Sequence, residues 1–100
     1  MAEVEWTARA QADLAEVAEY HAVRSVDYAE ALVRRLLSAV GRLEAFPRSG
    51  RRVPEIAGDS MREVVYRDYR IIYLHDEADD RVEILSVFHT SRQSEQPPGS

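Results

Sequence analysis

Cysteine is absent from the 100-residue chain, which excludes disulfide bonds, thiolate zinc sites and thiol catalysis. Lysine is absent too, and all 13 basic side chains are arginine. This bias fits either bidentate contacts with carboxylate or phosphate groups or the codon usage of a GC-rich genome. No stretch approaches the about 20 apolar residues of a membrane span, and the first residues lack a signal-peptide pattern. We therefore expect a cytoplasmic protein with one small core that is held by packing alone.

The charge of the chain is negative overall but unevenly distributed. A net charge of −5 argues against a general nucleic-acid binder, because neutralising phosphates requires clustered cations, so we expect no direct DNA binding by the protein alone. Residues 47–75 nevertheless carry six arginines against four acidic residues. Arg48, Arg51 and Arg52 surround a glycine in this segment. We interpret these three arginines as candidate contacts for an acidic partner, with simple solubility as the alternative.

The first half of the chain has the spacing of a short strand followed by two helices. Residues 3–6 alternate as in a strand, Thr7 is a candidate N-cap, and apolar positions on one helical face follow to about residue 24. Asp27 begins a capping-box pattern, and a second apolar stripe continues to Phe46. The short connection between the stripes predicts an antiparallel helical hairpin.

The second half changes to strand spacing. A loop rich in Pro, Gly, Arg and Ser covers residues 47–60, and three stretches rich in Val, Ile, Tyr and Phe follow it, at residues 62–66, 69–75 and 82–89. We predict an α+β fold of order β-α-α-β-β-β, with an antiparallel sheet and the helical hairpin packed on one face. Residues 1–90 form the single domain, and residues 91–100, which lack apolar residues that could pack, form a flexible C-terminal tail.

Five short motifs occur in a distinctive order over about residues 2–92. They are Trp6-Thr7 with Ala10, Asp13 and Leu14; Phe46-Pro47 with Gly50-Arg51; Met61-Arg62-Glu63; Tyr69-Arg70-Ile71-Ile72-Tyr73; and Val82-Glu83-Ile84-Leu85 with Val87, Phe88 and His89. In this order they resemble the RelE/ParE superfamily of toxins from bacterial type II toxin–antitoxin systems, and most closely its ParE branch. The resemblance implies a growth-arresting, plasmid-stabilising toxin that inhibits DNA gyrase. It also implies neutralisation by a cognate ParD-like antitoxin in a toxin–antitoxin hetero-oligomer, and no cofactor.

The resemblance leaves a second activity open, ribosome-dependent messenger RNA cleavage as in the RelE branch. Metal-independent RNA cleavage needs a base for the 2′-hydroxyl, a cation and an acid for the leaving oxygen. Arg70 matches a catalytic arginine of the ribonuclease members, and His89 lies near a position where some of them carry a functional histidine. Against this, Met61 and Glu63 replace two lysines, Thr90 replaces an arginine, and the tail lacks the tyrosine of those enzymes. A third possibility is a decayed toxin that only binds antitoxin.

Arg70, His89 and Arg92 are therefore our candidate target-binding residues, and Arg70 with His89 would be catalytic in a ribonuclease. A simpler interpretation of Arg70 is a structural arginine that pairs with Glu63 or Glu83 on a neighbouring strand. His89, at a strand end, could merely cap a hydrogen-bond network. The three histidines lie 14 or more positions apart without companion spacing, so we predict no metal site.

Overall fold

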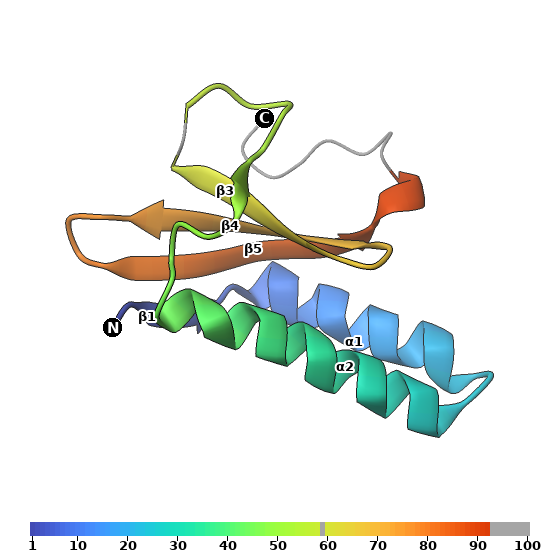
Figure 1. Cartoon of the computed structure of the whole chain (residues 1–100). Coiled ribbons are helices and arrows are strands. Elements are labelled where there is room, and N and C mark those ends of the chain that lie inside the picture. Colours follow the sequence, from blue (N-terminus) through green and yellow to red (C-terminus); the bar gives the residue numbers. More distant parts are fainter. Residues whose placement is uncertain (59, 93–100) are drawn as a thin grey trace.

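The computed structural model describes residues 1–58 and 60–92 as two layers, a helical hairpin against one face of a five-stranded sheet (Figure 1). The elements in chain order are β1 (Glu3–Trp6), α1 (Ala8–Ala22), α2 (Val26–Gly41), the 3₁₀ turn η1 (Arg42–Glu44), β2 (Arg51–Arg52), β3 (Met61–Tyr66), β4 (Tyr69–Asp76), β5 (Arg81–His89) and the 3₁₀ turn η2 (Thr90–Arg92). The predicted α+β fold with a helical hairpin on one face is confirmed. No helix in the described part of the chain is long and apolar enough to cross a membrane.

The sheet has the strand order β1-β5-β4-β3-β2. The predicted antiparallel meander of β3, β4 and β5 is confirmed. The sheet as a whole is mixed rather than antiparallel, because β1 pairs in parallel with β5 and places Trp6 opposite Ile84. The predicted loop contains the two-residue edge strand β2, which pairs with β3. These two edge pairings join segments that local spacing does not connect, so the sequence pattern did not predict them.

Both helices begin at side-chain caps. The predicted cap of α1 is confirmed, since Oγ1 of Thr7 accepts from the Ala10 N–H at 3.1 Å and donates to the Ile84 carbonyl at 2.7 Å. The same hydroxyl thus tethers α1 to β5. The cap of α2 is Ser25 rather than Asp27, and Asp27 lies in the first turn, where a negative charge favours the helix dipole.

The end of α2 also differs from the prediction. The α-helix ends at Gly41, and the 3₁₀ turn η1 follows it directly. Helical structure therefore ends before Phe46, whose side chain is 62% exposed. Ser91 and Arg92, the first two residues of the predicted tail, belong to η2. The remaining tail residues, 93–100, lie outside the described residues.

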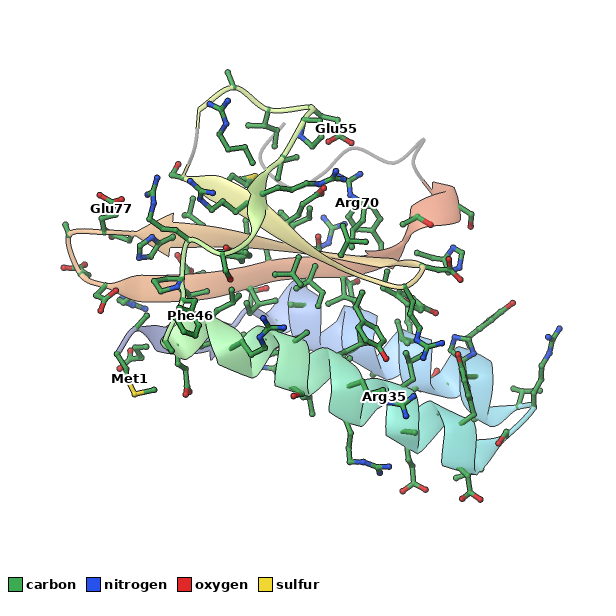
Figure 2. The ribbon with its side chains drawn as sticks, viewed as in Figure 1. Met1, Arg35, Phe46, Glu55, Arg70 and Glu77 are labelled. Carbon is green, nitrogen blue, oxygen red and sulfur yellow. The ribbon has the colours of Figure 1, made fainter. Side chains whose placement is uncertain are left out.

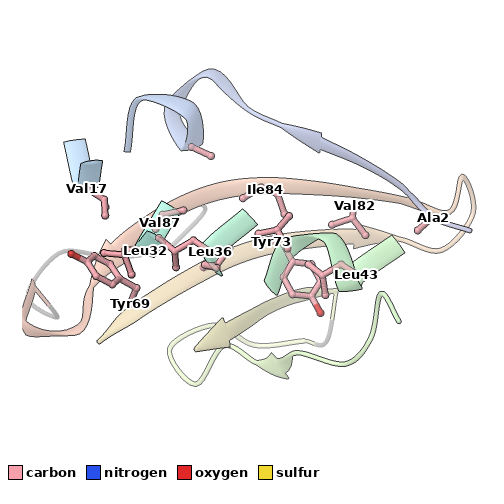
Figure 3. Close-up of a cluster of buried hydrophobic side chains, with 13 residues drawn as sticks. Ala2, Val17, Leu32, Leu36, Leu43, Tyr69, Tyr73, Val82, Ile84 and Val87 are labelled. Carbon is pink, nitrogen blue, oxygen red and sulfur yellow. The ribbon is translucent and has the colours of Figure 1, made fainter. Parts of the chain in front are cut away.

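The main core lies between the helices and the sheet face toward them, which we call the inner face (Figure 3). Tyr69, Ile71 and Tyr73 alternate along β4 and project into this core. They pack against a stripe of α2 made of Leu32, Leu36 and Val40. Each such aliphatic side chain contributes about 1.5–3 kcal/mol on burial.

The opposite side of the sheet, the outer face, carries a second and smaller cluster. Its buried members are Val53, Ile72 and Phe88, and Ile56 is one of the partly buried side chains packed against them. Val53 and Ile56 come from the loop between β2 and β3. The chain's own loop therefore covers part of the sheet face that lies away from the helices.

A register shift in β5 decides which side chains reach each face. Ile72 pairs with Ser86 and Tyr73 with Ile84, so Leu85 is an extra residue in β5. Beyond this bulge, Tyr69 pairs with His89. His89 consequently projects toward the helices.

Candidate functional site

Arg70 lies on the outer face and is only 5% exposed. Its Nε donates to Oε1 of Glu63 at 2.7 Å, and Nη1 and Nη2 donate to the two carboxylate oxygens of Glu55 at 2.9 Å each (Figure 2). The guanidinium carbon Cζ lies 5.3 Å from the centre of the Phe88 ring. Of the two carboxylates proposed as structural partners of Arg70, Glu63 is the one that pairs. Sequence reasoning missed Glu55, because a loop residue has no register relative to a strand.

These contacts belong to a buried network of alternating charges. Glu63 is 1% exposed and also pairs with Arg51. The hydrogen bonds from Arg70 hold the pKa of the Glu55 carboxyl below its ordinary value, and the Glu55 carboxylate in turn raises the pKa of Arg70. All three nitrogen atoms of the Arg70 guanidinium thus donate to carboxylates, which places Arg70 in a structural role in this conformation.

Arg70 and His89 project from opposite faces of the sheet. The register pairs Arg70 with Phe88 and Tyr69 with His89, and neighbouring residues of a strand alternate between faces. Accordingly, the His89 ring contacts the inner-face ring of Tyr69, with 5.2 Å between ring centres. The structure does not bring together the two residues that a ribonuclease of the predicted kind would use.

His89 instead lines a polar cleft of about 410 Å³ between α1 and the ends of β4 and β5, here named the His21–His89 cleft. Its other lining residues include His21 and Tyr69, and Nε2 of His21 lies 2.7 Å from the Tyr69 hydroxyl. Tyr69 is buried, with only 6% of its surface exposed. His21 is half-buried here. No sequence signal joined these residues, since they come from three separate elements.

The three arginines predicted to contact a partner are all exposed and lie near β2. Arg48 pairs with Glu77, and Arg51 keeps 63% of its side chain exposed despite its pair with Glu63. Arg52, the second residue of β2, is exposed as well. Arg92, the remaining predicted target contact, is the last residue of η2, and its side chain lies outside the described residues.

A hydrophobic groove follows the seam between α1 and α2, and we call it the hairpin groove. It consists of two hollows of about 460 and 470 Å³ that share Ala18 and Val33. The apolar side chains that line it include Trp6, Leu14, Ala15, Ala22, Val26, Ala29 and Leu37. The sequence does contain a signal for this groove, because apolar residues on both helices occupy more positions than one buried face requires.

The third histidine, His75, lies near the end of β4 and is 7% exposed. Its Nε2 is 3.5 Å from Oδ1 of Asp80. The neighbouring acidic turn is organised by Asp76, whose carboxylate accepts from the Ala78 N–H at 3.0 Å. Among the described residues, no three His, Cys, Asp or Glu side chains gather in a way that could hold a metal ion.

Comparison with known families tests the resemblance found in the sequence. The sequence model described as "ParE toxin of type II toxin-antitoxin system, parDE" matches residues 4–94. The chain belongs to the ParE toxin family. The predicted membership of the RelE/ParE superfamily, on its ParE side, is thereby confirmed.

Solved structures agree with this ParE fold. A chain of the chromosomal ParDE toxin–antitoxin system from P. aeruginosa superposes with a TM-score of 0.74 at 18% identity, covering 89% of this chain and 96% of that one. A chain of the RelBE2 toxin–antitoxin complex from Mycobacterium tuberculosis superposes with a TM-score of 0.61 at 25% identity, covering 88% and 96%. No curated protein sequence matches this ParE-family chain.

Proposed function

We propose that this ParE-family protein is a growth-arresting toxin that inhibits DNA gyrase and that a cognate ParD-like antitoxin neutralises. In this proposal it acts in the cytoplasm, as part of a plasmid-stabilising module and in a hetero-oligomer with its antitoxin. The observation that carries the choice of gyrase over messenger RNA is the separation of Arg70 from His89 by the sheet.

The chemistry of RNA cleavage explains why this separation counts. A base, an acid and a cation must all reach one phosphate group and its two flanking oxygens. Here the cation candidate, Arg70, donates to Glu55 and Glu63 on the outer face, and the acid–base candidate His89 lies on the inner face. Inhibition by binding requires no such assembly, so it fits the arrangement better.

The hairpin groove supports an antitoxin partner. It is apolar, continuous along both helices and open to solvent, as expected for a surface that receives an amphipathic helix. The two solved structures superposed above come from toxin–antitoxin systems. We propose that an antitoxin segment orders in this groove on binding, and that Arg48, Arg51 and Arg52 contact its acidic residues.

A pair of purified assays tests the target. The first measures supercoiling by gyrase with and without the protein, and the second measures cleavage of ribosome-bound messenger RNA. We expect inhibited supercoiling and intact messenger. Cleavage of messenger that is lost in His89→Gln would overturn the proposal, whereas no effect in either assay would favour a protein that only binds antitoxin. Arg70→Ala is unsuited to this test, because it removes a buried structural group.

Two substitutions test the antitoxin surface. Ala18→Arg places a long cation in the middle of the hairpin groove and should weaken binding of the cognate antitoxin by more than about tenfold, as for a disrupted interface centre. Arg35→Gln is the matched control, since Arg35 is an exposed α2 residue that is not among those lining the groove. Equal affinity of both variants, measured by calorimetry, would place the antitoxin elsewhere.

A further inference from the structure

We propose that the His21–His89 cleft is a binding site for a phosphate group, supplied by a nucleotide or by a nucleic-acid backbone. The site lies on the inner side of the sheet, opposite Arg70, and is formed by α1 with the ends of β4 and β5. The proposal does not depend on gyrase being the target.

One buried tyrosine positions two imidazoles in this cleft. Tyr69 is the first residue of β4, and its hydroxyl lies 2.7 Å from Nε2 of His21, in the last turn of α1. The same tyrosine ring meets the ring of His89 edge to face, with 5.2 Å between centres. Because Tyr69 is 6% exposed and packed in the main core, both imidazoles are held in place before any ligand arrives.

The hydrogen bonds of His89 determine which nitrogen can face a ligand. The Ser91 N–H donates to Nδ1 of His89 at 3.1 Å, and the Ser91 hydroxyl lies 2.7 Å from the same atom. A neutral His89 ring must therefore carry its proton on Nε2. Nε2 has no hydrogen-bond partner within residues 1–58 and 60–92, which leaves an N–H donor for a ligand oxygen.

Two guanidinium groups in the cleft can donate to an anion. Arg9 and Arg24 line it and are both exposed, and guanidinium groups match phosphate oxygens well. Of the two acidic residues in the lining, Asp13 already accepts from the Val87 N–H at 3.0 Å and lies 3.8 Å from Nε of Arg9. Glu16, the other, is exposed at the rim.

The rim offers a surface for the rest of a nucleotide. Tyr20 lines the same cleft and is 63% exposed, with its ring edge to face against His21. A base can stack on an exposed tyrosine without sequence preference. Donors that line the cleft and an exposed aromatic ring together fit a nucleotide phosphate better than a simple inorganic anion.

Proton NMR of the histidine rings in the full chain tests the site. Inorganic phosphate, AMP and the trinucleotide dTpdTpdT are titrated at constant pH and ionic strength, and the ring signals of all three histidines are followed. We expect saturable shifts for His21 and His89, with His75 unmoved because it lies buried at the other end of β4. Tighter binding of the trinucleotide would identify a nucleic-acid backbone as the source, and tighter binding of AMP a free nucleotide.

Three variants sharpen this test. His89→Gln and Arg24→Gln should each weaken binding by about tenfold, the usual effect of losing one charge-assisted hydrogen bond. Arg81→Gln is the matched control, since Arg81 is an arginine that pairs with Glu5 outside the cleft. Ring shifts no larger than those of His75, or affinities that His89→Gln and Arg24→Gln leave unchanged, would overturn the proposal. Neither result depends on the supercoiling assay.

Discussion

On the outer face, Arg70 and Glu63 are 5% and 1% exposed, and every nitrogen of the Arg70 guanidinium donates to a carboxylate. On the inner face, His21 and His89 are half-buried beside a cleft that is open to solvent. Buried charges persist only with partners, because desolvation is costly, whereas half-buried imidazoles can keep an unused hydrogen-bonding nitrogen. The comparison indicates that Arg70 has a structural role, whereas His21 and His89 line a cleft that can bind a ligand.

The largest expected effect comes from breaking the outer-face network. Arg70→Met leaves the Glu63 carboxylate buried without its main partner, and we expect the free energy of unfolding to fall by about 3–5 kcal/mol in urea denaturation. The double variant Arg70→Met with Glu63→Met should recover much of that loss. Arg67→Gln, at an exposed turn, is the control and should change stability by less than about 0.5 kcal/mol. An equal loss in the single and double variants would contradict the charge-pair explanation.

On the inner face, Tyr69→Phe removes only the hydroxyl that meets His21. We expect a loss of about 0.5–1.5 kcal/mol, the net value of one partly buried hydrogen bond. Tyr66→Phe provides the comparison, because the Tyr66 hydroxyl accepts from exposed Arg67 and contributes little. Chemical denaturation of both variants measures the difference, and equal stabilities would show that Tyr69 does not order His21.

Glu55→Gln should have a smaller and pH-dependent effect. Arg70 holds the pKa of Glu55 below its ordinary value of 4.5, so the stabilisation is fully present above pH 4.5 and is lost as pH falls toward the lower folded pKa. Because the Glu55 side chain is 42% exposed, we expect only about 0.2–1 kcal/mol at pH 7. Thermal unfolding of wild type and variant from pH 7 to pH 3 would show the gap closing. A gap that stays constant would mean that packing, not charge, is lost.

His89→Gln should have the smallest effect on stability. His89 is only partly buried and its side chain contacts the short η2 turn, so we expect a change within about 0.5 kcal/mol. Phosphate binding in the NMR titration should fall in the same variant. A large loss of stability would instead assign His89 a structural role like that of Arg70, and the contrast between the two faces would disappear.

Local patterns in the sequence predicted the helices and long strands well. The cap at Thr7 and the meander of β3, β4 and β5 follow from neighbouring residues, since capping and strand alternation are local effects. The cap of α2 was predicted at Asp27 and not at Ser25, because both residue types cap helices and only the geometry of the turn selects one. The direction of β1 depends on pairing with β5, far along the chain, and no local signal encodes it.

For the candidate sites too, the sequence predicted some contacts and missed others. The pair of Arg70 with Glu63 was one of two pairs considered, because both lie on predicted adjacent strands. Glu55 was missed, since its position depends on how a loop folds over the outer face. The contact between His21 and Tyr69 was missed as well, because it requires the packing of α1 on the sheet.

By itself, the sequence determined the ParE family, the α+β class and the absence of thiol chemistry, because these depend on composition, on local spacing and on the order of motifs along the chain. Only the tertiary structure decided that Arg70 is paired with two carboxylates and that His21 and His89 line the same cleft. The reason is physical: which face a strand residue occupies depends on a one-residue register, and the bulge at Leu85 changes that register within β5.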